Sequence, residues 1–548
     1  MRTPIALYLL ALVARAVLIA LQPDPAYPDS SYYADVARAI ADGHGFQTDF
    51  IWIFAEVGGK IPANPVLPIP SNGHWMPLAS MVQVPFLALF GPNPIAAAAP
   101  FALIGSLAAP LAWAIARDAG ANTRIAVGAG ILTALPALSF VFMAQPDNFS
   151  LYQPLVAGAL WLTARGLKGD ARAYALAGLL VGLATLSRND GLFVGLAVGL
   201  AFLWDRWRAW RSGGGRLPAI PFSAAVACLG LFLVVMAPWW WRQLDVFGQL
   251  SPSTASGKVL YIRSIAEWNS ITTPATLDYL LGQGWGPLLA SRIGGLVAAV
   301  GIYVTLVGAG LLVPLMVIGA WVRRRSDNFG PFFTYAAILF AFSGLVSAIH
   351  VPGGTFIHSA VALVPHSYVL ALEGVAVAVG WIAARRRTWD REAATRLFIV
   401  AAVGFGAFAA VAGVLAVHSR WDRSLNDRKA VGAALDLAGA APDDRLMSID
   451  SAGYRYVTGH PGVVTPNDPL ETIKSVADAY RISWLVLDRD DIVPALAPVL
   501  LSQARPPWIG PRLYQVPASD GGPPRVALYP ICLSAADPRC SVTASGVP

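Results

Sequence analysis

Apolar runs of roughly 18 or more residues, each long enough to cross a bilayer as a helix, alternate with shorter polar connections from residue 4 to residue 417. Lipid leaves open backbone unsatisfied, so helices are the structures that such runs can form there. The pattern therefore predicts a polytopic α-helical membrane protein with about eleven transmembrane helices. The runs that fit, with the N-terminus inside, are 4–21, 95–116, 125–144, 149–164, 173–187, 191–204, 219–241, 296–321, 331–349, 360–383 and 397–417.

The apolar stretch 77–90 is left out of this set because its roughly 14 residues are too few for a full crossing. Prolines and glycines bound it on both sides, which favours interfacial or re-entrant helices in the first outer loop, 22–94. The first run has no small-residue cleavage site after it, so we expect a retained helix rather than a signal peptide.

Composition agrees with a membrane protein, since 56% of the residues are hydrophobic and 13% are charged. The net charge of +7 does not indicate a nucleic-acid partner, because the cations gather in short loops that we expect to be cytoplasmic. These basic clusters are 117–124, 165–172, 206–216, 323–325 and 385–396. Abundant Ala, Gly and Arg is typical of a high-GC bacterium, so we expect a multi-pass protein of the bacterial inner membrane.

The sequence changes character after residue 417, where the long apolar runs end. Alternating segments predict strands at 445–450, 484–487, 513–516 and 526–529, with a helix at 468–480 between them. We therefore expect a transmembrane domain over 1–417 and a small soluble α/β domain over 418–548 on the outer face. Cys532 and Cys540 would pair if that face is oxidising.

Three acidic residues fall on the outer face in this topology, although they come from separate loops: Asp29, Asp147 and Asp190. A carboxylate at a membrane border is a functional candidate by default. The structural alternative is helix capping, which Asp29 or Asp147 could provide to a following helix. After Asp29, residues 35–42 predict a short amphipathic helix along the membrane, ended by the glycines at 43 and 45.

Cations and histidines on the same face are candidates for binding a phosphate. Arg188 lies at a break between two apolar runs, where its alternative role is a snorkelling anchor. Between His350 and His358, a proline and a pair of glycines interrupt the outer ends of two spans. The spacing of the two histidines, eight residues apart, does not match a known metal-binding motif. Lys258 and Arg263 lie in a long Trp-rich loop. Arg15 lies inside the first span and either snorkels or pairs with a buried acid.

No P-loop, nucleophile elbow, zinc-ligand spacing or haem motif is present. Soluble nucleotide sugars and ATP are therefore disfavoured as direct substrates. What remains is a membrane protein whose ionisable residues gather at one surface.

The order of these blocks resembles the GT-C membrane glycosyltransferases, within them most closely the branch of protein O-mannosyltransferases and aminoarabinose transferases. The likeness covers residues 27–46, 145–148, 187–191, 350–358 and the outer tail. It implies transfer of a sugar from a polyprenyl-phosphate carrier to a lipid, glycan or protein acceptor at the outer face. It also makes Asp29 the essential acid of the first outer loop.

The roles that we expect follow from this resemblance. Asp29 acts as general base on the acceptor, Asp147 is the second carboxylate, and the phosphate leaves with inversion. Phosphate binding falls to Arg188, Lys258, Arg263, His350 and His358. Substrate binding falls to Tyr32, Tyr33, His74 and Asp190. Many relatives have Asp-Glu where this chain has Asp29-Ser30, so we assign no metal ligand and leave a divalent cation open.

Two other classes of function compete with this expectation. A transporter or flippase for a lipid-linked or anionic solute would place charges at mid-membrane and often shows repeated halves. The expected charges lie at one surface here, and no repeat is visible. A scaffold protein that docks partners through its outer domain is the second alternative.

Overall fold

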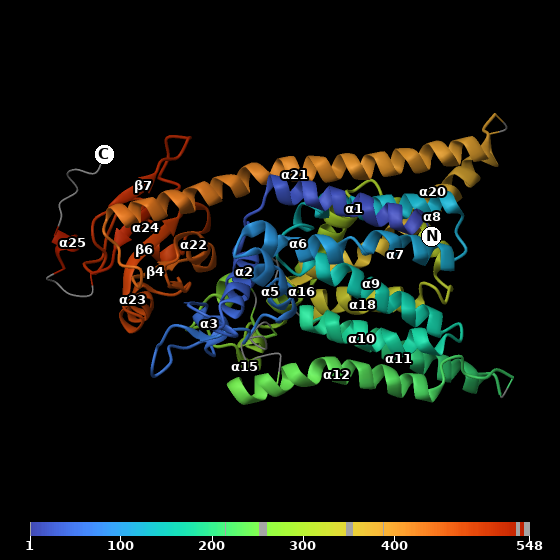
Figure 1. The fold of residues 1–548 in the computed structure, drawn as a ribbon, viewed down its shortest axis with the longest axis horizontal. Helices are drawn as coiled ribbons and strands as arrows, with labels where there is room; N and C mark the ends of the chain where they lie inside the picture. Colours follow the sequence, from blue (N-terminus) through green and yellow to red (C-terminus); the bar gives the residue numbers. More distant parts are fainter. Residues whose placement is uncertain are drawn as a thin grey trace.

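The computed structural model describes residues 2–213, 215–250, 260–262, 264–346, 355–386, 388–532 and 537–541. Long helices lie side by side and form a bundle, and an α/β lobe covers one end of it (Figure 1). The N-terminus lies at the far end of the bundle from this lobe. One helix, α21 (Arg391–Leu437), runs the length of the bundle and continues into the lobe.

Helices cover the apolar runs of the sequence. Besides α21, the bundle contains α1 (Arg2–Leu21), α6 (Pro94–Gly105), α7 (Ala108–Asp118), α8 (Thr123–Ala134), α9 (Phe149–Gly166), α10 (Ala171–Ser187), α11 (Gly191–Arg211), α12 (Phe222–Phe247), α16 (Trp285–Ile302), α17 (Val313–Arg323), α18 (Gly330–Ala341) and α20 (Val364–Ala383). Among the described residues, six helices or continuous helix pairs are long and apolar enough to cross a membrane. The polytopic helical fold is thus confirmed, and the number of eleven crossings stays a prediction.

Several of the expected spans are not single α-helices; 95–116, for example, is divided between α6 and α7. The run 125–144 is α-helical only to Ala134, and a 3-10 segment, η1 (Ala137–Phe142), follows. Pro136 causes the break because the residue before a proline avoids the helical conformation. The run 296–321 is divided between α16, a π segment η2 (Tyr303–Val307) and α17, with Gly310 at φ 72° in the connection.

The first outer loop folds into short elements. They are α2 (Pro28–Ala41), β1 (Gln47–Thr48), β2 (Phe50–Ile51), α3 (Ile53–Glu56), β3 (Ile69–Pro70), α4 (Leu78–Met81) and α5 (Val84–Phe90). The stretch 77–90 is therefore two short helices rather than one crossing. The expected amphipathic helix exists, but it begins at Pro28 and so includes Asp29 in its first turn. Two further short helices, α14 (Ile265–Trp268) and α15 (Leu277–Leu281), precede α16.

The lobe is built on a six-stranded sheet of order β2-β5-β4-β6-β8-β7. Its strands from the tail are β4 (Arg445–Ser448), β5 (Gly462–Val464), β6 (Ile482–Asp488), β7 (Tyr514–Val516) and β8 (Val526–Pro530). The helices around it are α22 (Ser451–Thr458), α23 (Leu470–Ala479), α24 (Ala497–Leu500) and α25 (Pro538–Ser541), with 3-10 turns η5 (Arg489–Asp491) and η6 (Pro494–Leu496). The four expected strands and the expected helix are present. β5 and α22 were not expected.

The boundary expected between residues 417 and 418 does not match a structural break. α21 is continuous across it. The outer loop also supplies the edge strand β2, which pairs in parallel with β5. Cys532 and Cys540 form a disulfide in the lobe.

The lobe holds α2, the helix on which Asp29 lies. Asp49 forms an ion pair with Arg455 of α22 at 2.6 Å. Arg38 of α2 lies 4.1 Å from the ring centre of Tyr456, also on α22. Sheet pairing, an ion pair and a cation–π contact therefore fix the outer loop against the lobe.

Candidate active site

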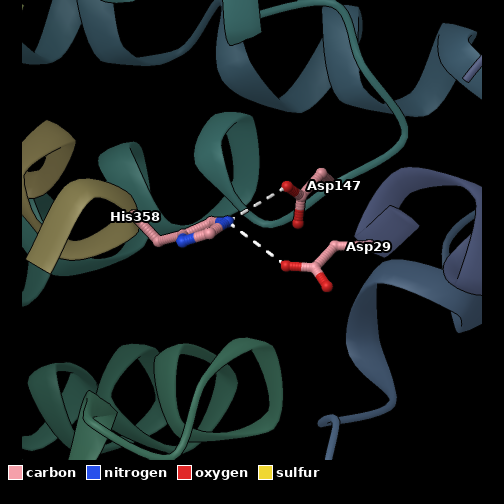
Figure 2. A group of neighbouring side chains, drawn as sticks. All are labelled: Asp29, Asp147 and His358. Carbon is pink, nitrogen blue, oxygen red and sulfur yellow. Dashed lines mark ion pairs between the residues drawn. The ribbon is translucent and has the colours of Figure 1, made fainter. Parts of the chain in front are cut away.

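Three ionisable side chains from three separate segments point toward one another (Figure 2). The Nε2 atom of His358 lies 3.4 Å from a carboxylate oxygen of Asp147 and 3.6 Å from one of Asp29. One ligand-type atom from each of the three lies within 4.8 Å of the others. We call these three residues the acid–histidine cluster.

Asp29 reaches the cluster because α2 begins beside it. Tyr27 is the N-cap residue of α2 and Pro28 occupies its first turn, so Asp29 is not the cap. A carboxylate in the first turn is favoured by the positive end of the helix dipole. The indole N–H of Trp75 donates a hydrogen bond to Asp29 at 3.2 Å. About a third of the Asp29 side chain is exposed, at 32%, so a ligand can reach it.

Asp147 reaches the cluster because α8 stops early. The chain runs from the break at Pro136 through η1 and turns into α9, whose N-cap residue is Asn148 rather than Asp147. The Asp147 side chain has no exposed surface. It accepts hydrogen bonds from the Asn148 backbone N–H at 2.5 Å and from the Tyr27 hydroxyl at 2.9 Å.

The two carboxylates differ in their electrostatic surroundings. Burial and the nearby charge of Asp147 raise the pKa of Asp29, and His358 opposes this. Burial also acts to raise the pKa of Asp147, but the charge and hydrogen bond of His358 outweigh it and lower the pKa below the usual value. Asp29 is therefore the carboxyl of the pair that takes up a proton first.

His358 lies on α19 (Thr355–Ala360), and its ring faces both carboxylates. Its ring stacks on Phe149 at a centroid distance of 4.4 Å, and only 7% of the residue is exposed. Phe149 begins α9 directly after the loop of Asp147. The same turn of chain thus positions both Asp147 and the histidine that faces it.

Arg188 and Asp190 form an ion pair with each other, and the charge of Arg188 also acts to lower the pKa of Asp29. Arg188 Nε lies 2.9 Å from Asp190, and the Ser359 hydroxyl donates a hydrogen bond to the other oxygen of Asp190. Burial lowers the pKa of Arg188, but the charge of Asp190 more than offsets this and raises it. This pair ties the break between α10 and α11 to the segment of His358.

Of three residues expected to bind substrate, Tyr32 and Tyr33 are buried, whereas His74 is partly exposed. Tyr32 has no exposed surface, and its hydroxyl accepts a hydrogen bond from the Asn72 backbone N–H at 2.7 Å. Tyr33 is 2% exposed, and its hydroxyl accepts one from the Asn148 side chain at 2.6 Å. Burial lowers the pKa of His74 to about 4, so this ring is neutral at physiological pH. The two tyrosines support the site from within the core and are too buried to contact a substrate.

Three of the expected phosphate ligands, Lys258, Arg263 and His350, lie outside the described residues. Sequence reasoning missed another cation, Arg242, as a site residue. Arg242 lines a cavity of about 670 Å³ with mainly apolar walls, which we call the Arg242 pocket. Its other lining residues include Phe46, Ile69, Met81, Leu186 and Trp239.

Arg242 forms no ion pair with a carboxylate in the part of the chain that the structure describes. Its guanidinium packs near the rings of Phe46 and Trp239, at 5.0 and 4.9 Å from their centres. Nη2 donates to the Ser71 carbonyl at 2.8 Å, whereas Nη1 has no partner. The three tryptophans just before Arg242 could have indicated it as a site residue, because aromatic faces beside a cation suit the binding of a sugar phosphate.

Comparisons with known proteins show what the chain is similar to. Residues 74–241 match the family of dolichyl-phosphate-mannose-protein mannosyltransferases. ArnT from Cupriavidus metallidurans has a similar structure in its apo state, with TM-score 0.54 and 15% identity over 96% of this chain and 97% of ArnT. The undecaprenyl phosphate complex of ArnT gives TM-score 0.56 and 15% identity over 97% and 98% of the two chains.

An oligosaccharyltransferase from Archaeoglobus fulgidus, solved with zinc and sulfate, is similar as well. Its TM-score is 0.54 at 15% identity, over 92% of this chain and 72% of the archaeal one. No curated protein sequence matches the chain. At these identities the structural likeness shows a shared fold.

Proposed function

We propose that this chain, which its fold and partial family match place in the GT-C superfamily of membrane glycosyltransferases, transfers a sugar from a polyprenyl-phosphate carrier to an acceptor at the outer membrane border. The observation that carries the proposal is the convergence of Asp29, Asp147 and His358 from three distant segments. Support for a lipid-linked donor comes from ArnT, which was solved bound to undecaprenyl phosphate.

Asp29 acts as the general base of this reaction. A base works best when its pKa lies near the working pH, and burial together with Asp147 shifts the pKa of Asp29 upward. The ionised Asp29 accepts the proton of the acceptor group as that group attacks the anomeric carbon. The bond from this carbon to the lipid phosphate breaks, and the configuration inverts.

Asp147 and His358 assist without taking the acceptor proton. Asp147 stays ionised because His358, Tyr27 and the Asn148 backbone all favour its charged form. A fixed negative charge beside the sugar stabilises the positive charge that develops on the anomeric carbon. His358 stacks on Phe149 and lies close to both carboxylates.

The leaving phosphate needs positive charge, and Arg242 supplies it in the described part of the chain. Arg242 lines the Arg242 pocket, and its buried Nη1 has no hydrogen-bond partner. The apolar walls of the pocket suit the hydrocarbon that adjoins the phosphate of a polyprenyl carrier. The other expected phosphate ligands remain further candidates for this role: Arg188, Lys258, Arg263, His350 and His358.

The proposed location is the inner membrane of a bacterium, with the lobe outside. The basic clusters at one end of the helices support this orientation. The disulfide between Cys532 and Cys540 supports it too, because such bonds persist in oxidising compartments.

The acid–histidine cluster also has a donor set that fits a divalent cation, since two carboxylates and an imidazole present atoms within 4.8 Å of one another. A bound cation would supply positive charge for a phosphate oxygen. The proposed base needs only a free lone pair on Asp29, so we expect sugar transfer to continue in chelator-treated protein. Loss of transfer that a divalent cation restores would make these side chains cation ligands instead.

The direct experiment incubates purified protein in lipid nanodiscs with radiolabelled polyprenyl-phosphate sugars and candidate lipid, glycan or peptide acceptors. The proposal predicts labelled acceptor and free polyprenyl phosphate in equal amounts. Movement of intact donor across a vesicle membrane without cleavage would instead establish a flippase.

A further inference from the structure

Arg15 is a charged residue buried inside the apolar helix α1, with no exposed surface. A cation at membrane depth is costly and is kept where it has a task. Nη1 donates to the backbone carbonyls of Ala11 and Ala134, both at 3.3 Å. Within the described ranges it has no carboxylate partner, and its Nε and Nη2 atoms make no hydrogen bond.

The contact with Ala134 falls at the point where α8 ends inside the bundle. Ala134 is the last residue of α8, and Pro136 then breaks the helix. The last carbonyls of a helix lack intrahelical partners, and lipid offers none. A positive charge at this end also complements the helix dipole. Arg15 therefore holds the end of α8 against α1.

Two segments that lead to the acid–histidine cluster start at this contact. The first arm, 15–29, follows α1 outward to Asp29. The second arm, 134–147, follows η1 outward to Asp147. The two catalytic carboxylates are thus the outer ends of two segments whose inner ends Arg15 joins.

The outer ends of the arms are joined as well. The Ala26 backbone N–H donates to the side-chain oxygen of Gln145 at 2.9 Å, and the Tyr27 hydroxyl donates to Asp147 at 2.9 Å. Gln145 is 2% exposed. Hydrogen bonds at both ends therefore determine how the first arm lies against the second.

Close packing around Arg15 leaves the guanidinium little room to move. A Cβ atom added at Gly105 of α6 would come 3.2 Å from Arg15 Nε and 2.9 Å from Ser150 Cβ. The Ser150 hydroxyl in turn donates to the Met143 carbonyl in the second arm at 2.6 Å. Arg15 and the turn that carries Asp147 thus pack against the same glycine.

We propose that Arg15 is a positioning residue for sugar transfer, which together with Gln145 sets the separation of the Asp29 and Asp147 carboxylates. The proposal rests on the proposed function, because a positioning residue acts through the reaction that it serves. A misplacement of about 1 Å at a reacting group costs on the order of 100-fold in rate. The effect should therefore appear in kcat rather than in the KM for the donor.

The kinetic test compares Arg15→Met, Arg15→Lys and Gln145→Leu with the unchanged protein in nanodiscs. We expect kcat to fall about 10- to 100-fold in Arg15→Met and Gln145→Leu, with donor KM within about twofold of the unchanged protein. Arg15→Lys, which keeps the charge and a donor, should recover most of the loss. A matched control is Arg323→Gln, which alters a partly exposed arginine paired with the buried Glu373 and should lower thermal stability but not kcat.

A second measurement does not depend on activity. In protein carrying Cys228→Ala, the pair Asp29→Cys and Asp147→Cys should be joined rapidly by a short thiol-reactive cross-linker. Adding Arg15→Met or Gln145→Leu should slow the cross-linking at least several-fold. Equal cross-linking rates, or an unchanged kcat per folded molecule in both variants, would overturn the positioning role. Altered cross-linking in a protein that transfers no sugar would reject only the proposed function.

Discussion

The lobe and the outer end of the bundle both bury acidic side chains, yet only one of them has the features of a reaction centre. In the lobe, Asp488 has a pKa raised to about 7, first by burial and then by the charge of Asp450. Its carboxyl accepts a hydrogen bond from the Tyr454 hydroxyl at 3.1 Å, and Arg428 pairs with Asp450 at 2.5 Å. These groups pair with one another inside the lobe, and the second oxygen of Asp488 is buried without a hydrogen-bond partner.

At the outer end of the bundle, Asp29 also has a raised pKa, but it remains about one third exposed and faces a histidine and a second carboxylate. Two carboxylates around one imidazole leave lone pairs directed at a common point. The comparison teaches that a shifted pKa alone does not identify a site. Convergence together with access does.

The largest loss of sugar transfer should come from a change at the outer end of the bundle rather than in the lobe. Replacing Asp29 by Asn removes the base and keeps the shape, so transfer should fall by about 10²–10⁴-fold while expression and membrane insertion persist. The rate of sugar transfer measures this, with Asp42→Asn at the exposed end of α2 as the matched control. Near-normal turnover in Asp29→Asn would remove this residue from its role.

A smaller effect should come from the Arg242 pocket. Arg242→Gln keeps a polar side chain but removes the charge, so donor KM should rise roughly tenfold, in line with loss of a charge-assisted contact. Titration with a polyprenyl phosphate that carries no sugar should show the same weakening. Unchanged affinity for both lipids would place phosphate binding elsewhere.

The smallest effect should arise in the lobe and concern stability alone. As pH rises from about 4 to about 7, an unfolded chain ionises Asp488 while the folded protein keeps the proton, so the raised pKa lowers stability across this window. Asp488→Asn removes that loss. The variant should therefore melt higher than the unchanged protein at pH 8, by roughly 2–4 °C per kcal/mol recovered, with an unchanged transfer rate. A lower transfer rate per folded molecule would contradict the comparison.

Hydrophobic patterning was sufficient to predict the helical bundle, since the length of a crossing depends on local composition. It also predicted the main strands of the lobe, whose alternation is local. The sequence shows the proline at 136, where α8 breaks. It does not show that Arg15 donates a hydrogen bond to the last residue of α8, which allows the helix to end inside the bundle. Strand β2 is only two residues long and pairs with a strand far along the chain, which no local pattern indicates.

Sequence reasoning selected Asp29, Asp147 and His358 because each lies where a span ends at the outer face, and the structure brings these three together. It did not foresee that Asp190 would compensate the charge of Arg188, because the directions of these two neighbouring side chains are set by the fold. It also placed Tyr32 and Tyr33 at the substrate, although both fill the core beneath it. Position along a membrane can be predicted from sequence, whereas the direction of a side chain requires the fold.

The most direct test of the central claim, that Asp29 accepts the proton, is the pH dependence of kcat/KM for the unchanged protein and for Asp147→Asn. Protonated Asp29 cannot act as a base, so the rate should fall toward low pH with an apparent pKa above the usual value of about 4. Asp147→Asn removes a charge that raises this pKa, so the acid limb should move to lower pH. An acid limb at the same pH in both proteins, or none in either, would contradict the account.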